Sequence, residues 1–449
     1  MKKSLELFYS RISSRSQIVV KNVVLSGFVK AGSIFVSLLT VPVTLKYLTQ
    51  NEYGVWLTVY SIMTWLMYFD GGLGSGLRNR FTEAKATDAI HEIRSYISTS
   101  YFILLATIAI LIPLLFILNY WIDWASFLNI PHKESPSFNR AIFIIFSLFC
   151  SQFVFRLIDS ILIADQRSGE ADLLNMIGSA LSLVIFYFLS FQIQGSFLLV
   201  GAVFCGVPSL VNITYSIYLF SSRYKNFSPS YKFIDLKYYK DLMTLGSKFF
   251  IIQICSLVTI GSTNIIIAKI LGPSEVVVYN LAYKYFSFVL ISFTILTGSI
   301  YSSFNEAYQK GDIPWIRNIV RKINLIGFSF FGLILIMVIF SNFVYSLWVG
   351  PDIKIPQILS IFMGIYYSIT IWATVYTTFI SGVGKIKIAY YVSIVNSVVY
   401  IPLAVILGKY FGVEGVVCAQ ILLFISGFYW LPRQYEKLIS RTATGIWNQ

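Results

Sequence analysis

Residues 21–46 read KNVVLSGFVKAGSIFVSLLTVPVTLK, an apolar segment long enough to cross a lipid bilayer as a helix. A spanning helix needs about 20 predominantly apolar residues. Similar segments recur along the whole chain of 449 residues, of which 57% are hydrophobic and only 12% are charged. Soluble domains carry about 25% charged residues, so this composition excludes an ordinary soluble protein. The sequence therefore predicts an all-α, multi-pass membrane protein.

The apolar segments divide into two sets of six, which predicts twelve membrane-spanning helices. The first set covers residues 21–46, 54–77, 95–119, 141–164, 172–190 and 196–221, and the second covers 242–269, 276–304, 320–347, 356–381, 387–408 and 414–435. The most polar stretch of the chain lies between the two sets. We therefore expect an N-lobe of residues 1–221, a cytoplasmic linker of residues 222–241 and a C-lobe of residues 242–449.

The distribution of basic residues predicts the orientation. Only six fall on one side of this layout: Lys46, Lys133, Arg140, Lys269, Lys354 and Lys409. Since cytoplasmic loops carry the excess of Lys and Arg, both termini are expected in the cytoplasm. The net charge of +14 reflects this topology and attraction to anionic lipids, and nucleic acid is not an expected partner.

The two halves resemble each other in sequence. At a constant offset of 223 residues, Glu52 pairs with Glu275, RFTEA at residues 80–84 with SFNEA at 303–307, and Arg94 with Arg317. Because each half contains an even number of predicted helices, both copies begin on the same side of the membrane. This pattern predicts a parallel internal repeat, an arrangement found in transporters.

Five charged residues lie at membrane depth in the predicted helices. They are Lys30, Arg156, Asp159, Lys248 and Lys284. A charge near the centre of a spanning helix costs about 2.5–3.5 kcal/mol on insertion scales, so such residues face a cavity or a partner. Arg156 and Asp159 are three residues apart and could simply neutralise each other, and Lys248 could extend its ammonium group to the interface.

Hydroxyl side chains extend these positions into stripes on one helix face. The first stripe comprises Ser26, Lys30, Ser33, Ser37, Thr40 and Thr44, and the tenth predicted helix carries Thr370, Thr374 and Thr377. Such stripes also occur where helices pack closely. If they face inward instead, they line a central cavity whose charge is positive, and Lys30, Arg156, Lys248 and Lys284 are candidates for binding an anionic substrate there.

The stretch DGGLGSGLRNRFTEA, residues 70–84, looks at first like a phosphate-binding loop. It lacks the Lys and Ser or Thr that follow the last glycine of a P-loop, and Leu77 occupies the last glycine position of the dinucleotide-binding pattern. Gly72 and Gly76 instead form GxxxG, a spacing that lets helices approach closely. We interpret Asp70, Gly72, Gly76, Arg78 and Asn79 as a cytoplasmic gate at the end of the second helix.

YLTQNEYGVW followed by FDGGLGSGLRNRFTEA resembles the first two helices of Wzx-type O-antigen flippases. These belong to the multidrug/oligosaccharidyl-lipid/polysaccharide exporter superfamily, and the similarity is strongest over residues 20–95. The resemblance implies a bacterial inner-membrane protein that moves an oligosaccharide on undecaprenyl pyrophosphate to the periplasmic leaflet by alternating access. It further implies membrane lipid, a polysaccharide polymerase and a chain-length regulator as partners.

No catalytic residue, metal centre or bound cofactor is expected. The four cysteines lie in apolar segments without CxxC spacing, and His91 and His132 are far apart in the chain. The resemblance suggests coupling to an H⁺ or Na⁺ gradient, for which Asp159 is the candidate carboxylate. Arg156 beside it would favour the charged form and argues against proton coupling.

Other functions fit the sequence less well. A multidrug cation antiporter of the same superfamily would need more buried carboxylates than one. A lipid II flippase usually has more than twelve helices. A glycan polymerase or glycosyltransferase would need a long external loop with paired carboxylates, whereas Asp123 and Glu134 are spread apart in the largest such loop here.

Overall fold

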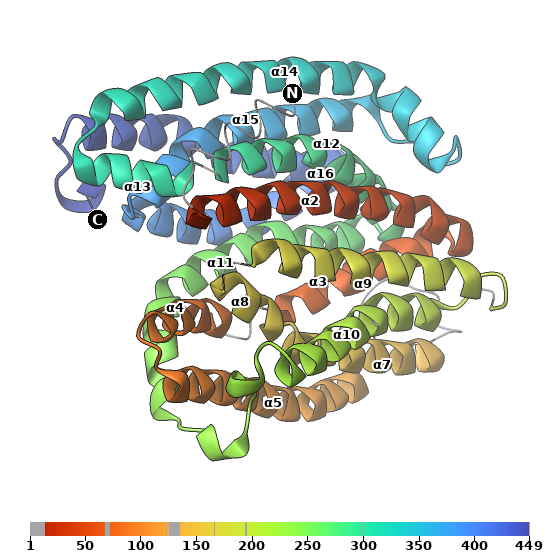
Figure 1. The fold of residues 1–449 in the computed structure, drawn as a ribbon. Helices are drawn as coiled ribbons and strands as arrows, with labels where there is room; N and C mark the ends of the chain where they lie inside the picture. Colours follow the sequence, from red (N-terminus) through yellow and green to blue (C-terminus); the bar gives the residue numbers. More distant parts are fainter. Residues whose placement is uncertain are drawn as a thin grey trace, which may run out of the picture. The chain divides into compact units, whose positions relative to one another are not determined.

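The computed structural model describes residues 14–67, 72–122, 124, 135–165, 167–193, 195–298 and 300–448 (Figure 1). The described residues are helical, joined by turns, and contain no strand. The helices of the first half are α2 (Ser14–Tyr47), α3 (Gln50–Leu66), α4 (Leu73–Ala86), α5 (Ile90–Trp121), α7 (Ser135–Phe155), α8 (Leu157–Ala164), α9 (Ser168–Leu189) and α10 (Phe197–Ser221). Those of the second half are α11 (Lys237–Ile270), α12 (Pro273–Gly298), α13 (Tyr301–Lys310), α14 (Ile313–Val349), α15 (Gln357–Gly382) and α16 (Lys387–Ile439).

Nine of the described helices are long and apolar enough to cross a membrane. One of them, α16, is two helices merged across a kink at Gly412, whose φ of 66° and ψ of −148° are not helical. Glycine adopts such a conformation without the steric penalty of a Cβ atom. This kink lies between the eleventh and twelfth predicted segments. The chain is therefore a multi-pass membrane protein, and a total of twelve spans stays a prediction.

The chain divides into two compact units. The first contains Met1–Leu48 and Met63–Phe250, and the second contains Thr49–Ile62 and Ile251–Gln449. The start of α3 belongs to the second unit because it packs on α12. A Cβ atom at Gly54 would lie 1.7 Å from the carbonyl oxygen of Pro273. The two backbones therefore approach so closely that only glycine fits at this position.

Two predicted helices are in fact broken, which corrects the sequence analysis. The second segment was predicted to run unbroken over 54–77, but α3 ends at Leu66 and α4 begins at Leu73. Gly72 precedes α4 with a left-handed φ of 88°, so the chain turns at this glycine instead of continuing a helix into α4. The eighth segment, predicted over 276–304, likewise ends at Gly298 before α13 begins.

The helices that flank these breaks begin at matching places in the two halves. The starts of α3 and α12, at Gln50 and Pro273, are 223 residues apart, and so are the starts of α5 and α14 at Ile90 and Ile313. Each half thus has a longer helix, a short helix and a long helix in the same order. This spacing equals the sequence offset that predicts the internal repeat.

The short helix α4 is held by an apolar core in the first unit. Leu73, Leu77, Phe81 and Ala84 recur every three or four residues, so they share one face, and all are buried. They pack against buried side chains of α5 and α8, among them Ile97. Burial of each large side chain contributes about 1.5–3 kcal/mol, which fixes α4 in place although its opposite face is charged.

The predicted linker lies on the first unit and contains two short 3₁₀ turns, Lys225–Phe227 and Tyr231–Phe233. Its helix α11 begins at Lys237, earlier than the predicted residue 242. Thr99 of α5 fixes the linker twice, since its hydroxyl accepts the Asp235 amide at 3.1 Å and donates to the Asp235 carbonyl oxygen at 3.3 Å. The backbone amide of Lys237, together with its side chain, lowers the pKa of Asp235 and keeps this carboxylate charged at neutral pH.

Replacing Thr99 with Val should loosen the linker without changing the volume of the side chain. Two hydrogen bonds to Asp235 would be lost, each contributing about 1 kcal/mol. Amide hydrogen exchange over residues 228–237 should become at least fivefold faster. The matched variant Thr107→Val removes only a bond to the carbonyl of Ile103 on the same helix, so it should leave linker exchange unchanged. Equal exchange in both variants would contradict this role.

Candidate functional site at the end of helix α4

The glycine-rich motif brings α4 unusually close to α11. A Cβ atom at Gly76 would lie 2.3 Å from the carbonyl oxygen of Leu242, far inside van der Waals contact. Of the predicted gate residues, Gly72 precedes α4, and Gly76, Arg78 and Asn79 lie within it. Asp70 lies outside the described residues. The motif therefore acts, where it is described, as a turn followed by a close helix contact.

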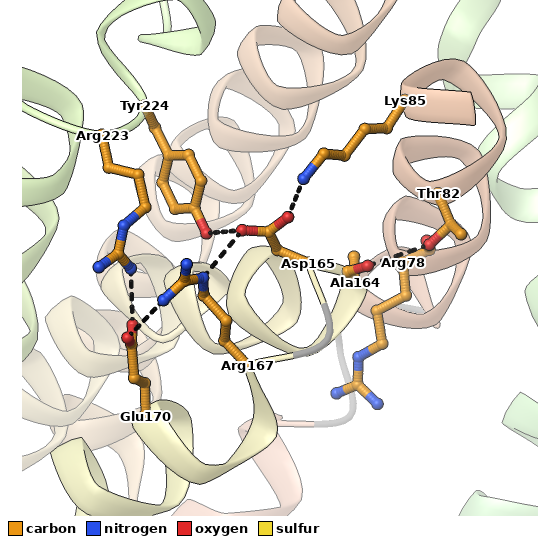
Figure 2. Close-up of polar contacts among 9 residues, drawn as sticks. All are labelled: Arg78, Thr82, Lys85, Ala164, Asp165, Arg167, Glu170, Arg223 and Tyr224. Atoms are coloured by element: carbon orange, nitrogen blue, oxygen red, sulfur yellow. Dashed lines mark hydrogen bonds and ion pairs between the residues drawn. The ribbon is translucent and has the colours of Figure 1, made fainter. Parts of the chain in front are cut away.

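The charged face of α4 meets the loop between α8 and α9 (Figure 2). Lys85 forms an ion pair with Asp165, and the Thr82 hydroxyl donates to the carbonyl of Ala164 at 3.3 Å. The Asp165 carboxylate also accepts from the Tyr224 hydroxyl at 2.7 Å and from Arg167 Nε at 3.2 Å. Its side chain is only 8% exposed. A nearly buried carboxylate is thus satisfied by three donors from three parts of the first unit.

A second carboxylate continues the cluster along α9. Glu170 pairs with Arg167 at 2.8 Å and, through its other oxygen, at 2.8 Å with Arg223, which lies just after α10 in the linker. The alternating charges Lys85, Asp165, Arg167, Glu170 and Arg223 form one connected chain in Figure 2. The Arg78 side chain extends away from Asp165 in the same view. We refer to these five residues with Tyr224 as the α4 charge cluster.

The electrostatics of the α4 charge cluster keep its hydrogen bonds and ion pairs formed. Burial, followed by the hydrogen bond to Asp165, raises the pKa of Tyr224 well above its usual range. The hydrogen bond to Glu170 likewise raises the pKa of Arg223. Tyr224 therefore stays a hydrogen-bond donor and Arg223 a cation at any physiological pH. The cluster ties α4 and α9 to the loop between α8 and α9 and to the segment after α10, and it can be opened only by separating opposite charges.

Arg156 and Asp159, which were predicted in the cavity, do lie together in the first unit. Arg156 Nε is 3.5 Å from Asp159 Oδ2, and the side chains are 49% and 9% exposed. Asn175 of α9 donates to Asp159 Oδ2 at 3.1 Å. The other oxygen, Oδ1, is buried and has no hydrogen-bond partner among the described residues. Arg156 thus neutralises the charge of Asp159, while one oxygen of the Asp159 carboxylate makes no hydrogen bond to a described residue.

The three predicted lysines are not gathered at one place within either unit. Lys30 is exposed on α2 in the first unit, and Lys284 is half-buried on α12 in the second. Lys248 lies on α11, but its side chain is outside the described part of the structure. In the predicted stripes, Thr40, Thr44 and Thr374 donate to carbonyls of their own helices at 2.7–2.8 Å. These hydroxyls keep only acceptor capacity for a ligand.

The α4 charge cluster was not predicted from the sequence. A signal was present in ADQRSGEAD at residues 164–172, where acidic and basic residues alternate in a short loop between two apolar segments. Its partners Lys85 and Arg223 lie 80 and 53 residues from the acids that they bind. No local pattern predicts those pairings.

The fold defines a class of protein, the polytopic helical membrane proteins. A solved structure described as the inward-facing conformation of a multidrug resistance MATE family transporter of the MOP superfamily is similar, with a TM-score of 0.69 and 17% identity over 94% of this chain and 96% of that one. The outward-facing conformation of a transporter of the same family gives a TM-score of 0.65 and 15% identity at the same coverage. At these identities the likeness establishes the fold alone.

The sequence also matches a family profile described as "Polysaccharide biosynthesis protein" over residues 19–307. Since this match covers more than half of the chain, the protein belongs to that family. A Salmonella typhi protein named as an O-antigen transporter is 23% identical over 96% of this chain and 98% of its own length. A Yersinia pseudotuberculosis protein named as an O-antigen export protein is 22% identical over 91% and 94%. The relatives are thus named as transporters, not as enzymes.

Proposed function

We propose that this protein is a flippase that moves undecaprenyl-pyrophosphate-linked oligosaccharide units from the cytoplasmic to the periplasmic leaflet of the bacterial inner membrane. The observation that carries the proposal is the end-to-end similarity to relatives named as O-antigen transporter and export protein. The family and the transporter fold agree with it. Transport proceeds by alternating access of an N-lobe, residues 1–221, and a C-lobe, residues 242–449, joined by the linker 222–241.

In this proposal both termini are cytoplasmic and the halves are a parallel repeat. The equal 223-residue offset between helix starts in the two halves supports the repeat. Lys30, Arg156, Lys248 and Lys284 supply positive charge for the pyrophosphate, because phosphate oxygens prefer charge-assisted hydrogen bonds. A polysaccharide polymerase and a chain-length regulator would act on the exported product.

Asp159 is the candidate for coupling to an ion gradient. Its unused Oδ1 and its burial beside Asn175 offer a place for a proton or a sodium ion. Because Oδ2 is already hydrogen-bonded and, among the described residues, Oδ1 is not, Asp159 could bind and release an ion at Oδ1 without a rearrangement of its helix.

The proposal predicts what accumulates in cells that lack the protein. Complete polyprenyl-linked repeat units should be stranded on the cytoplasmic leaflet, and surface polysaccharide should be lost. Truncated units would indicate a missing sugar-transfer step, and unchanged lipids would favour a drug antiporter.

The double variant Lys30→Gln/Lys284→Gln, expressed in cells that lack the protein, should give export at least tenfold lower than the unaltered protein does. The control variant Lys354→Gln changes an exposed loop lysine and should restore export fully. Normal export by the double variant at normal protein level would exclude these lysines from binding.

A further inference from the structure

A cavity of about 610 Å³ lies in the second unit, between the start of α14 and the ends of α15 and α16. It contains none of the residues assigned to transport above. Its principal polar lining comprises Arg317, Arg321, Asn324, Tyr376, Tyr435 and Glu436. All three helices have apolar stretches long enough to cross a membrane. The cavity therefore lies where the ends of spanning helices meet the headgroup region of a bilayer.

One wall of the cavity is cationic. Arg317, Arg321 and Asn324 are spaced four and three residues apart, so they share one face of α14. Both arginine side chains are exposed, and neither forms an ion pair with a carboxylate in the described part of the chain. Two guanidinium groups one helical turn apart match the oxygens of a phosphate, to which arginine binds in a bidentate manner.

Arg94 is the residue in the first half that corresponds to Arg317, and the linker fills the space beside its side chain. Arg94, which pairs with Arg317 at the 223-residue offset, donates to the carbonyl of Ser228 at 2.9 Å and lies 4.3 Å from the centre of the Phe233 ring. The linker thus supplies an oxygen acceptor and an aromatic ring to Arg94. In the second unit, the space beside Arg317 is a cavity that the rings of Tyr376 and Tyr435 also line.

The opposite wall suits a cation. Glu436 directly follows Tyr435 on α16, and both line the cavity together with Tyr376 of α15. The two rings meet edge to face with their centroids 5.6 Å apart, and the Tyr376 hydroxyl is hydrogen-bonded to Asn324. A carboxylate beside tyrosine rings is a favourable environment for an ammonium group, through charge and through cation–π attraction.

We propose that this cavity binds the phosphoethanolamine headgroup of a membrane phospholipid, with the phosphate on Arg317 and Arg321 and the primary ammonium between Glu436 and the tyrosine rings. The cavity lining carries both charges, as the headgroup does, with two arginines on α14 and a carboxylate on α16. Basic pockets between helices at a membrane surface bind lipid headgroups, and the carboxylate here adds selectivity for a zwitterion over a purely anionic lipid. The site is independent of the substrate that the protein transports.

The test is lipid binding to the purified, detergent-solubilised full chain, measured by native mass spectrometry. The probes are a short-chain phosphatidylethanolamine, the matching phosphatidylglycerol and soluble phosphoethanolamine. The Arg317→Gln and Arg321→Gln variants should each bind both lipids about tenfold more weakly, because a charge-assisted contact is lost. Glu436→Gln should weaken only phosphatidylethanolamine binding, and soluble phosphoethanolamine should compete poorly because it lacks the acyl chains.

Lys322→Gln is the matched control, since Lys322 is an exposed cation on α14 outside the cavity lining. It should bind both lipids as the unaltered protein does, and Arg317→Lys should recover part of the affinity that Arg317→Gln loses. Unchanged binding in the two Arg→Gln variants would overturn the site. An unchanged preference between the two lipids in Glu436→Gln would overturn the ammonium position, and displacement by soluble phosphoethanolamine at equal concentration would overturn a lipid as the source.

Discussion

Replacing Gly76 with Ala is expected to destabilise the first unit by about 3 kcal/mol, the upper part of the range for overpacked sites. The added Cβ atom would lie 2.3 Å from the carbonyl oxygen and 3.0 Å from the carbonyl carbon of Leu242. These are backbone atoms of α11, so the clash cannot be relieved by rotating a side chain. Either α4 or α11 must move, and the apolar core that holds α4 would open.

The change is measured as the loss of unfolding free energy of the purified protein in mixed micelles, alongside surface polysaccharide in cells. Gly332→Ala is the matched control, since Gly332 lies within helix α14 and nothing lies within 4 Å of its added Cβ. That substitution should be neutral or stabilise by up to about 1 kcal/mol through helix propensity. If both variants unfold alike, the close contact between α4 and α11 is not what requires glycine.

Replacing Asp165 with Ala should have the second large effect, a loss of about 2–3 kcal/mol. The carboxylate binds Lys85, Arg167 and Tyr224 and is itself nearly buried. Hydrogen bonds to charged groups contribute about 1.5–3 kcal/mol, and removal of the acid leaves its donors without their acceptor. The cations are 49% and 39% exposed, so water compensates part of this loss. We expect α4 to separate from the loop between α8 and α9.

Glu83→Gln provides the comparison for this prediction. The Glu83 side chain is 60% exposed, and its carboxylate pairs with Arg80, three residues earlier on the same helix. Exposed pairs of this kind contribute well under about 1 kcal/mol, so stability should change little. Hydrogen exchange in α4 should rise at least tenfold in Asp165→Ala and stay unchanged in Glu83→Gln. Equal exchange in the two variants would contradict a holding role for the α4 charge cluster.

Part of the candidate site could be predicted from sequence because its signals are local. Arg156 and Asp159 are one helical turn apart, and the structure places them 3.5 Å apart. Gly72 and Gly76 indicated a close helix approach, which the structure finds between α4 and α11. The prediction of one unbroken helix over 54–77 was wrong, because Gly72 takes a left-handed conformation that a hydropathy pattern does not reveal.

The sequence by itself determined that this is an all-helical, multi-pass membrane protein with the motif of an O-antigen flippase-like family. The length and apolar composition of a spanning helix are set by the thickness of the bilayer, so they can be read from each segment without knowing which helices pack beside it. Only the tertiary structure decided that Asp165 joins Lys85 to Tyr224, and that Arg317 faces an open cavity while Arg94 is covered by the linker. These partners are distant in the chain, so their pairing depends on how the helices pack.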